Sequence, residues 1–90
     1  MIVPASTVQR IANPNMGRGY FAVQSMDTVL ANIVYILPYE AEAEVFLNNG
    51  FALGGYGVFE IQNCLTNVSK SAWYAYTTVA TGINLRVVDL

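Results

Sequence analysis

Hydrophobic and polar residues alternate along this chain in short segments that are typical of β-strands. Runs rich in Val, Ile, Tyr, Phe and Thr are separated by Gly, Pro and Asn at intervals of roughly ten residues. No stretch of helix length repeats its apolar residues with a period of 3.6. We therefore predict strands at residues 6–11, 20–26, 31–37, 51–53, 57–62, 71–78 and 83–90.

One more extended segment, at residues 39–49, would bring the total to about eight strands. Short strands of this kind bury their apolar faces as two packed sheets. The pattern thus predicts an all-β fold, a small antiparallel β-sandwich with Greek-key or jelly-roll connectivity.

Several predicted strands are apolar on both sides. In the segment at residues 72–76, Trp73 and Ala75 point to one side and two tyrosines to the other. A strand in a small sandwich normally shows one face to the core and the other to water. We therefore expect another protein to cover the second face, through Tyr35, Leu37, Tyr74, Tyr76 and Val88.

The segment YEAEAEVFLNNG, which starts at Tyr39, allows two interpretations. Glu and Ala favour a helix, which Asn49-Gly50 could end, but the charges have a period of two and Asn-Gly is also a hairpin signal. We prefer the extended form, in which Glu40, Glu42 and Glu44 line a charged edge that faces solvent or a partner. Calcium binding and acid–base catalysis are minor alternatives, because five strand residues spread these carboxylates over ~13 Å.

The chain begins with the apolar stretch MIVPA. It lacks a basic start and a cleavage site, so no secretory signal is expected. Residues 1–12 are predicted to form an N-terminal arm that reaches a neighbouring subunit through Ile2 and Val3. The alternative is an edge strand of the chain's own domain, because Pro4 is unsuited to a central strand.

Composition points to a single domain, residues 1–90, with a surface poor in charge. Hydrophobic residues make up 54% and charged residues 11% of the chain, against roughly 25% charged in an ordinary soluble domain. Such a composition suits a protein that packs against neighbours. The longest apolar run, residues 28–39, is interrupted by Asn32 and Pro38 and is shorter than the roughly 20 residues of a membrane-spanning helix.

Catalytic and metal-binding chemistry has little support in the sequence. Histidine is absent, and the single cysteine, Cys64, is expected to be buried and inert. Four basic residues cannot form a stripe for nucleic acid. We expect no enzyme activity, no cofactor and no metal. A carbohydrate-binding adhesive module is an alternative, because sugar sites use exposed Tyr or Trp near Asn.

Five segments together resemble a recurring type of small bacteriophage virion protein. They are the Asn-Pro-Asn loop with its basic residue at 13–18, the strand end at 23–25, the glycine turn and strand at 54–61, and the closing strands at 72–76 and 82–89. Proteins of this type are β-sandwich modules of capsid decoration or cement, head fibres and tail attachments.

The resemblance implies a non-enzymatic structural protein on the virion. It would be made in the host cytoplasm and would bind the capsid exterior as a decoration or cement subunit that stabilises the head. The implied partners are the major capsid protein or another virion protein, together with further copies of the chain, most often as a trimer. A head-fibre base or tail accessory module is the alternative within the particle.

Overall fold

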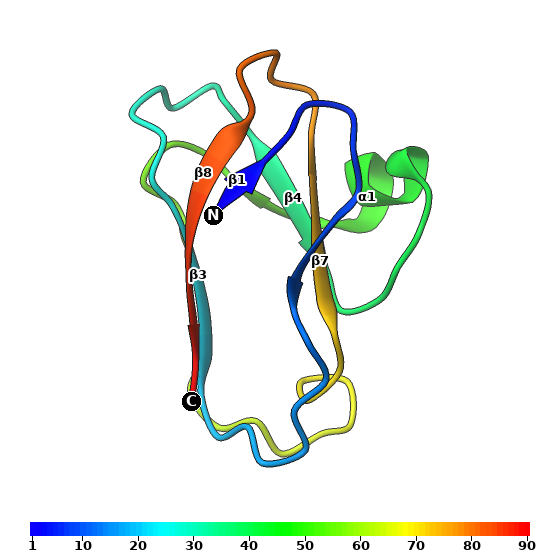
Figure 1. The fold of residues 1–90 in the computed structure, drawn as a ribbon. Helices are drawn as coiled ribbons and strands as arrows, with labels where there is room; N and C mark the ends of the chain where they lie inside the picture. Colours follow the sequence, from blue (N-terminus) through cyan, green and yellow to red (C-terminus); the bar gives the residue numbers. More distant parts are fainter.

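Eight short strands form two four-stranded antiparallel sheets that pack face to face (Figure 1). The structure is a computed structural model that describes residues 1–90. The elements in chain order are β1 (Ile2–Val3), β2 (Gln9–Ala12), β3 (Phe21–Ser25), β4 (Val34–Leu37), α1 (Ala43–Asn49), β5 (Phe51–Leu53), β6 (Val58–Ile61), β7 (Trp73–Thr77) and β8 (Ile83–Asp89).

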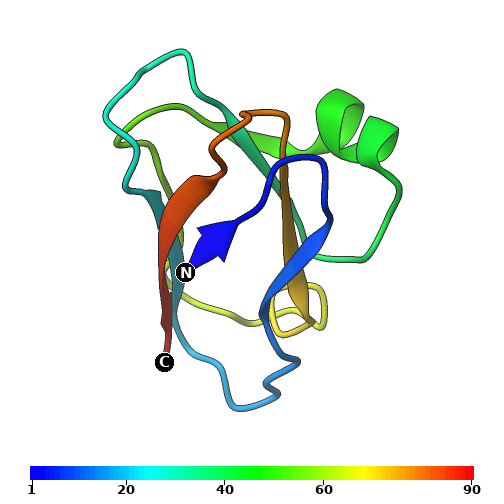
Figure 2. The same cartoon turned by 45° about the horizontal axis from the view of Figure 1, so that its top comes forward.

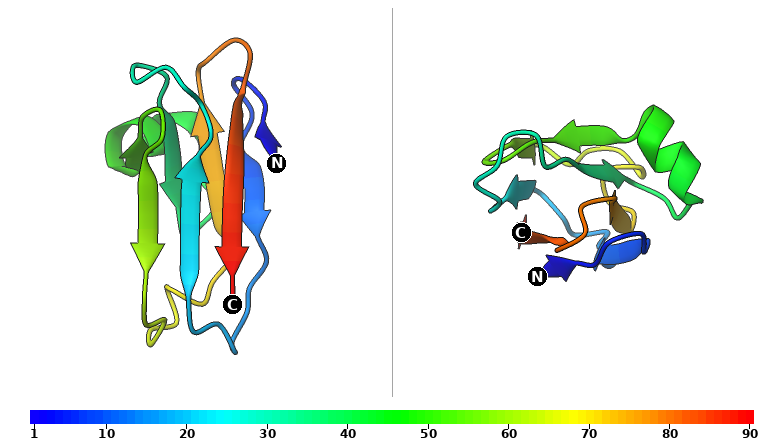
Figure 3. Two further views of the ribbon diagram at one scale, coloured as in Figure 1. Left: turned by 90° about the vertical axis from the view of Figure 1, so that its left-hand side faces the viewer. Right: turned by 90° about the horizontal axis from the view of Figure 1, so that it is seen from above.

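The strand order is that of a jelly roll. The first sheet, sheet I, has the order β1-β8-β3-β6, and the second, sheet II, has the order β2-β7-β4-β5. Strands therefore pair as 1 with 8, 2 with 7, 3 with 6 and 4 with 5, so that the chain is one long hairpin rolled into two layers (Figure 3). The predicted all-β sandwich is confirmed, and of the two connectivities that the sequence allowed, Greek key and jelly roll, the structure has the jelly roll.

The main core lies between the two sheets. Phe21 and Val23 of β3 and Trp73 and Ala75 of β7 point into it, as their alternation predicts. Cys64 is buried there too, as expected. The further buried members are Val3, Ile11, Ala12, Val34, Ile36, Leu53, Ile83 and Leu85.

The outer face of sheet II is covered by α1 of the same chain (Figure 2). Phe46 of the helix is completely buried and packs with Leu37, Tyr74 and Tyr76, which are only 3–8% exposed. The prediction that these three residues lie outside the core, against another protein, is therefore corrected. The second apolar face is filled intramolecularly because a helix crosses it.

The preference for an extended form of residues 39–49 was wrong, because residues 43–49 are helical. The helix-forming tendency of Glu and Ala outweighed the period-two charge pattern once Phe46 had a sheet to pack against. The helix stops at Gly50, whose amide donates to the Phe46 carbonyl at 2.9 Å. A Cβ at Gly50 would lie 2.6 Å from that oxygen, so glycine permits the close approach.

Residues 1–12 belong to the chain's own sheets rather than to an arm on a neighbouring subunit. Val3 pairs with Ile83 of β8 and is fully buried, whereas Ile2 points outward and is 57% exposed. The Ser6 amide donates to the Thr77 carbonyl at 2.8 Å. This corresponds to the alternative of an edge strand in the same domain.

The one helix, α1, lacks the length and apolar character needed to span a membrane.

Candidate functional site

A groove opens between the two sheets on the side where their edge strands β5 and β6 meet. Its volume is about 290 Å³. The walls are apolar, and the polar part of the lining comes from the connection between β6 and β7. The lining residues are Pro38, Phe51, Phe59, Ile61, Asn63, Thr66, Val68, Ser69 and Trp73.

Aromatic rings lead from the core to the mouth of the groove. Trp73 stacks on buried Phe21 with ring centroids 5.1 Å apart, and the Phe59 ring centroid lies 5.4 Å from that of Trp73. Phe51 follows at 4.7 Å from Phe59 and is 48% exposed. The Trp73 indole is fixed by a hydrogen bond of 3.3 Å from its Nε1 to the Ser69 carbonyl. The groove thus has a rigid floor and an exposed aromatic rim.

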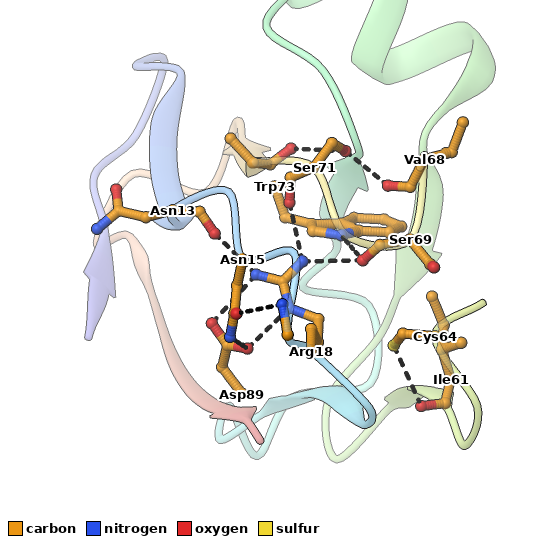
Figure 4. A network of polar contacts seen from close by, with 12 residues as sticks. Asn13, Asn15, Arg18, Ile61, Cys64, Val68, Ser69, Ser71, Trp73 and Asp89 are labelled. Carbon is orange, nitrogen blue, oxygen red and sulfur yellow. Dashed lines mark hydrogen bonds and ion pairs between the residues drawn. The ribbon is translucent and has the colours of Figure 1, made fainter. Parts of the chain in front are cut away.

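Arg18 forms the polar network that holds the loops around the groove (Figure 4). Its guanidinium has no exposed surface and binds the Asp89 carboxylate through two hydrogen bonds, of 2.7 and 3.1 Å. It also donates at 2.8 Å to the carbonyls of Asn13, Ser69 and Ser71.

This network joins three segments that are far apart in the chain. They are the loop before β3, the connection between β6 and β7, and the end of β8. Ser69 is the link to the groove, since its carbonyl accepts from both Arg18 and Trp73. The Asn-Pro-Asn loop and its arginine therefore have a structural role, and they position the groove rather than line it.

Acid should weaken this network. Hydrogen bonding from Arg18 holds the pKa of Asp89 below its ordinary value of 3.8. A carboxyl whose pKa is lower in the folded chain stabilises the fold above its unfolded pKa, and this contribution is lost as the pH falls through the folded value. We expect Asp89→Asn to be less stable than the wild type at pH 7, with a difference that narrows below about pH 4. Urea midpoints between these pH values test this, and a pH-independent difference would contradict it.

None of the ten residues predicted to lie in a contact lines the groove. Val3, Leu37, Tyr74 and Tyr76 are buried, and Tyr35 and Val88 are half-buried. Ile2, Glu40, Glu42 and Glu44 are exposed. The three glutamates do not line a strand edge: Glu40 and Glu42 precede the helix and Glu44 lies in its first turn. No group of three acidic, Cys or His residues is placed to hold a metal ion.

The sequence interpretation missed Phe51, Asn63 and Thr66 as site residues. Phe59 and Ile61 lie in the predicted strand at 57–62 and their alternation turns both toward the core, but their exposure at a groove depends on how the sheet edges meet. The available signal was the polar stretch of residues 62–71 between two aromatic strands. The groove contains no ionisable side chain. It can therefore bind an apolar group by burying it, and Asn63, Thr66 and Ser69 can form hydrogen bonds to that group's polar atoms.

Comparison of the chain with protein-family models, curated proteins and solved structures finds no match. Its function is therefore inferred from its own residues, fold and groove.

Proposed function

We propose that this protein is a non-enzymatic structural component of a bacteriophage particle. In this proposal it binds the outside of the capsid as a decoration or cement subunit and stabilises the head. Its partner is the major capsid protein or another virion protein. The segments that resemble small virion proteins support the proposal, as does the jelly roll, an architecture that recurs in viral capsid proteins.

The observation that carries the proposal is the aromatic groove. Phe51 and Phe59 offer apolar area over the floor formed by buried Trp73 and have little conformational freedom, which are the properties of interface hot spots. The groove has the hydroxyls of Thr66 and Ser69 but no acid or base beside them, which an active site would need to activate a nucleophile. A side chain or loop of the partner would fill it.

The remaining surface also suits association. Fourteen large hydrophobic residues are at least 43% exposed, whereas the whole chain has only ten charged residues. Individual contacts of a small domain are weak, but many copies on one shell act together and reinforce the contacts between its subunits.

A head-fibre base or tail accessory module would use the same groove, so localisation has to separate these alternatives. An exposed Tyr or Trp beside an Asn would support the alternative of a carbohydrate-binding module. Trp73 lies near Asn63 in the groove but is only 2% exposed, so it presents no open ring for stacking on a sugar. The jelly roll does not separate this alternative from the proposal, because the architecture recurs in lectin domains as well as in viral capsid proteins.

Localisation tests the proposal directly. Particles of the virus that encodes the chain should carry it in many copies, and a gold-labelled antibody should decorate intact heads. Labelling of the tail or of fibre bases alone would favour the accessory module. Absence of the chain from purified particles would overturn the proposal.

Replacing the aromatic rim of the groove should weaken attachment. We expect Phe51→Ser to reduce binding to particles stripped of the protein by about 30-fold or more, because a hot-spot aromatic contributes about 2 kcal/mol or more. Leu47→Ser is the matched control, since Leu47 is 43% exposed on α1 and does not line the groove. Equal binding of the two variants in a sedimentation assay would remove the groove from the contact.

A further inference from the structure

The outer face of sheet I is the one broad sheet surface that the chain leaves uncovered. The helix covers sheet II (Figure 2), and no element lies over the outer side of β8, β3 and β6, which face the viewer in the left view of Figure 3. Ile2 and Val58 on this face are both 57% exposed, and Val88 is half-buried. Ile2 and Val88 are two of the residues predicted from the sequence to lie in a contact.

Strand register arranges the outward side chains at the centre of this face in two rows of three. In one row Arg86, Gln24 and Val58 lie side by side on β8, β3 and β6. In the next row Val88, Ala22 and Glu60 occupy the same three strands. Arg86 and Glu60 are thus at opposite corners, and the two valines occupy the other two corners.

The two charges at opposite corners do not pair within the chain. Strand and residue spacings place them about 12 Å apart, and Arg86 has neither a hydrogen bond nor an ion pair to another side chain. Glu60 is held in place, because the Tyr20 hydroxyl and the Gln62 amide both donate to its carboxylate. The Tyr20 hydrogen bond also lowers the pKa of Glu60, so the carboxylate is charged at neutral pH.

This arrangement is self-complementary under one two-fold rotation. The two-fold axis lies in the plane of the interface and passes through Val58 and Val88. Rotation about this axis places Arg86 of each copy over Glu60 of the other. The same rotation brings Val58 next to its equivalent and Val88 next to its equivalent. An axis along or across the strands would instead place both charges on valines, which would bury them without partners.

We propose that the outer face of sheet I binds a second copy of this chain, in a two-fold dimer joined by two reciprocal Arg86–Glu60 pairs around a centre formed by Ala22 and Gln24, with Val58 and Val88 along the axis. The two sheets cross at a steep angle in this dimer, as in orthogonal sheet packing. The contact pairs copies through a closed two-fold, whereas the resemblance to virion proteins implied a trimer. It leaves the groove free, so it is independent of the proposed attachment to a particle.

The footprint of a sheet this small is below the standard interface size, which predicts a dimer of micromolar affinity or weaker. We therefore expect light scattering and sedimentation of the pure chain, from about 10 μM to 1 mM, to show a monomer–dimer equilibrium. A monomer throughout this range would overturn the proposal, and so would a trimer.

Charge reversal identifies the surface. We expect Arg86→Glu and Glu60→Arg to weaken dimerisation at least about tenfold each, because each places two like-charged pairs in the contact, and the double variant R86E/E60R to restore it. Both residues are exposed, so the fold should persist, and circular dichroism checks this. Lys70→Glu is the control, because it changes the net charge by the same amount as R86E but lies in the connection between β6 and β7, away from this face.

The Glu60→Arg variant separates pair recognition from net charge. It changes the formal charge from −2 to zero (−2 + 2), which reduces overall repulsion, yet it should still weaken the dimer. A dimer that is insensitive to both single reversals, or a double variant that is no better than the single ones, would overturn the proposal.

A crosslink provides a second measurement on the same face. Val58→Cys should oxidise rapidly to a covalent dimer, because the two copies of residue 58 lie close together near the axis, and the native Cys64 is buried. Leu47→Cys on α1 is the exposed control. Equal crosslinking rates for the two variants would contradict the proposed axis.

Discussion

Replacing Arg18 by methionine should destabilise the fold by about 3–5 kcal/mol, because a guanidinium with no exposed surface loses all its hydrogen bonds and each buried acceptor left without a donor costs about 1–3 kcal/mol. Methionine fills a similar volume but provides no donors. The variant removes five hydrogen bonds: two to the Asp89 carboxylate and one each to the carbonyls of Asn13, Ser69 and Ser71. Ser69 keeps its hydrogen bond from Trp73, and Asp89 keeps one from Asn15 and is partly exposed to water. The loss is therefore largest at the carbonyls of Asn13 and Ser71, because a buried acceptor without a donor costs stability.

Urea unfolding followed by circular dichroism measures this effect. Arg86→Met is the matched control, since this arginine is exposed and has no side-chain partner, and its removal should change stability by no more than about 0.5 kcal/mol. Arg18→Lys should be intermediate, because an ammonium group cannot reach all the acceptors that the planar guanidinium binds. If Arg18→Met were as stable as the control, the network would not be what joins the three segments around the groove.

Replacing Phe46 by alanine should release α1 from sheet II and cost about 3–5 kcal/mol, as for other fully buried phenylalanines. Phe46 is the only fully buried residue of this seven-residue helix, and a helix so short is not stable without tertiary contacts. Its release would uncover Leu37, Tyr74 and Tyr76. The variant should therefore bind a hydrophobic dye and self-associate at concentrations where the wild type does not.

Leu47→Ala tests whether the effect is specific to the buried position. Leu47 is the next residue on the same helix and is 43% exposed, so its replacement should have a small effect on urea stability and none on dye binding. If Phe46→Ala behaved like Leu47→Ala, the helix would not be the cover of the second apolar face. The original expectation, that another protein covers this face, would then regain its support.

Most strands followed from the local pattern of the chain. Alternation of apolar and polar residues acts over a few positions, so the turn residues and the inward faces of β3, β6 and β7 were visible without any knowledge of partners. The inward direction of Trp73 and Phe59 is an example. The jelly roll was one of two connectivities compatible with this pattern, because strand order depends on long-range pairing.

The helix illustrates where local information failed. Two turns are too short to show a period of 3.6, and the alternating glutamates and alanines imitated a strand. The decisive residue was Phe46, a single side chain whose burial requires a sheet made of β4 and β7. The alternation correctly indicates that these strands are apolar on both sides. It does not indicate which segment covers the second side, because the cover is a distant helix of the same chain.

The candidate site depended on contacts between residues that are distant in the sequence. The strands, the low content of charged residues and the absence of histidine follow directly from the sequence, because they depend on composition and on neighbouring positions. The groove exists because β5 and β6 meet at the edges of different sheets. The connection between β6 and β7, which lines the groove, is held by hydrogen bonds from Arg18, and Arg18 is ion-paired with Asp89. Such features arise from packing in three dimensions, so no pattern within a single segment specifies them.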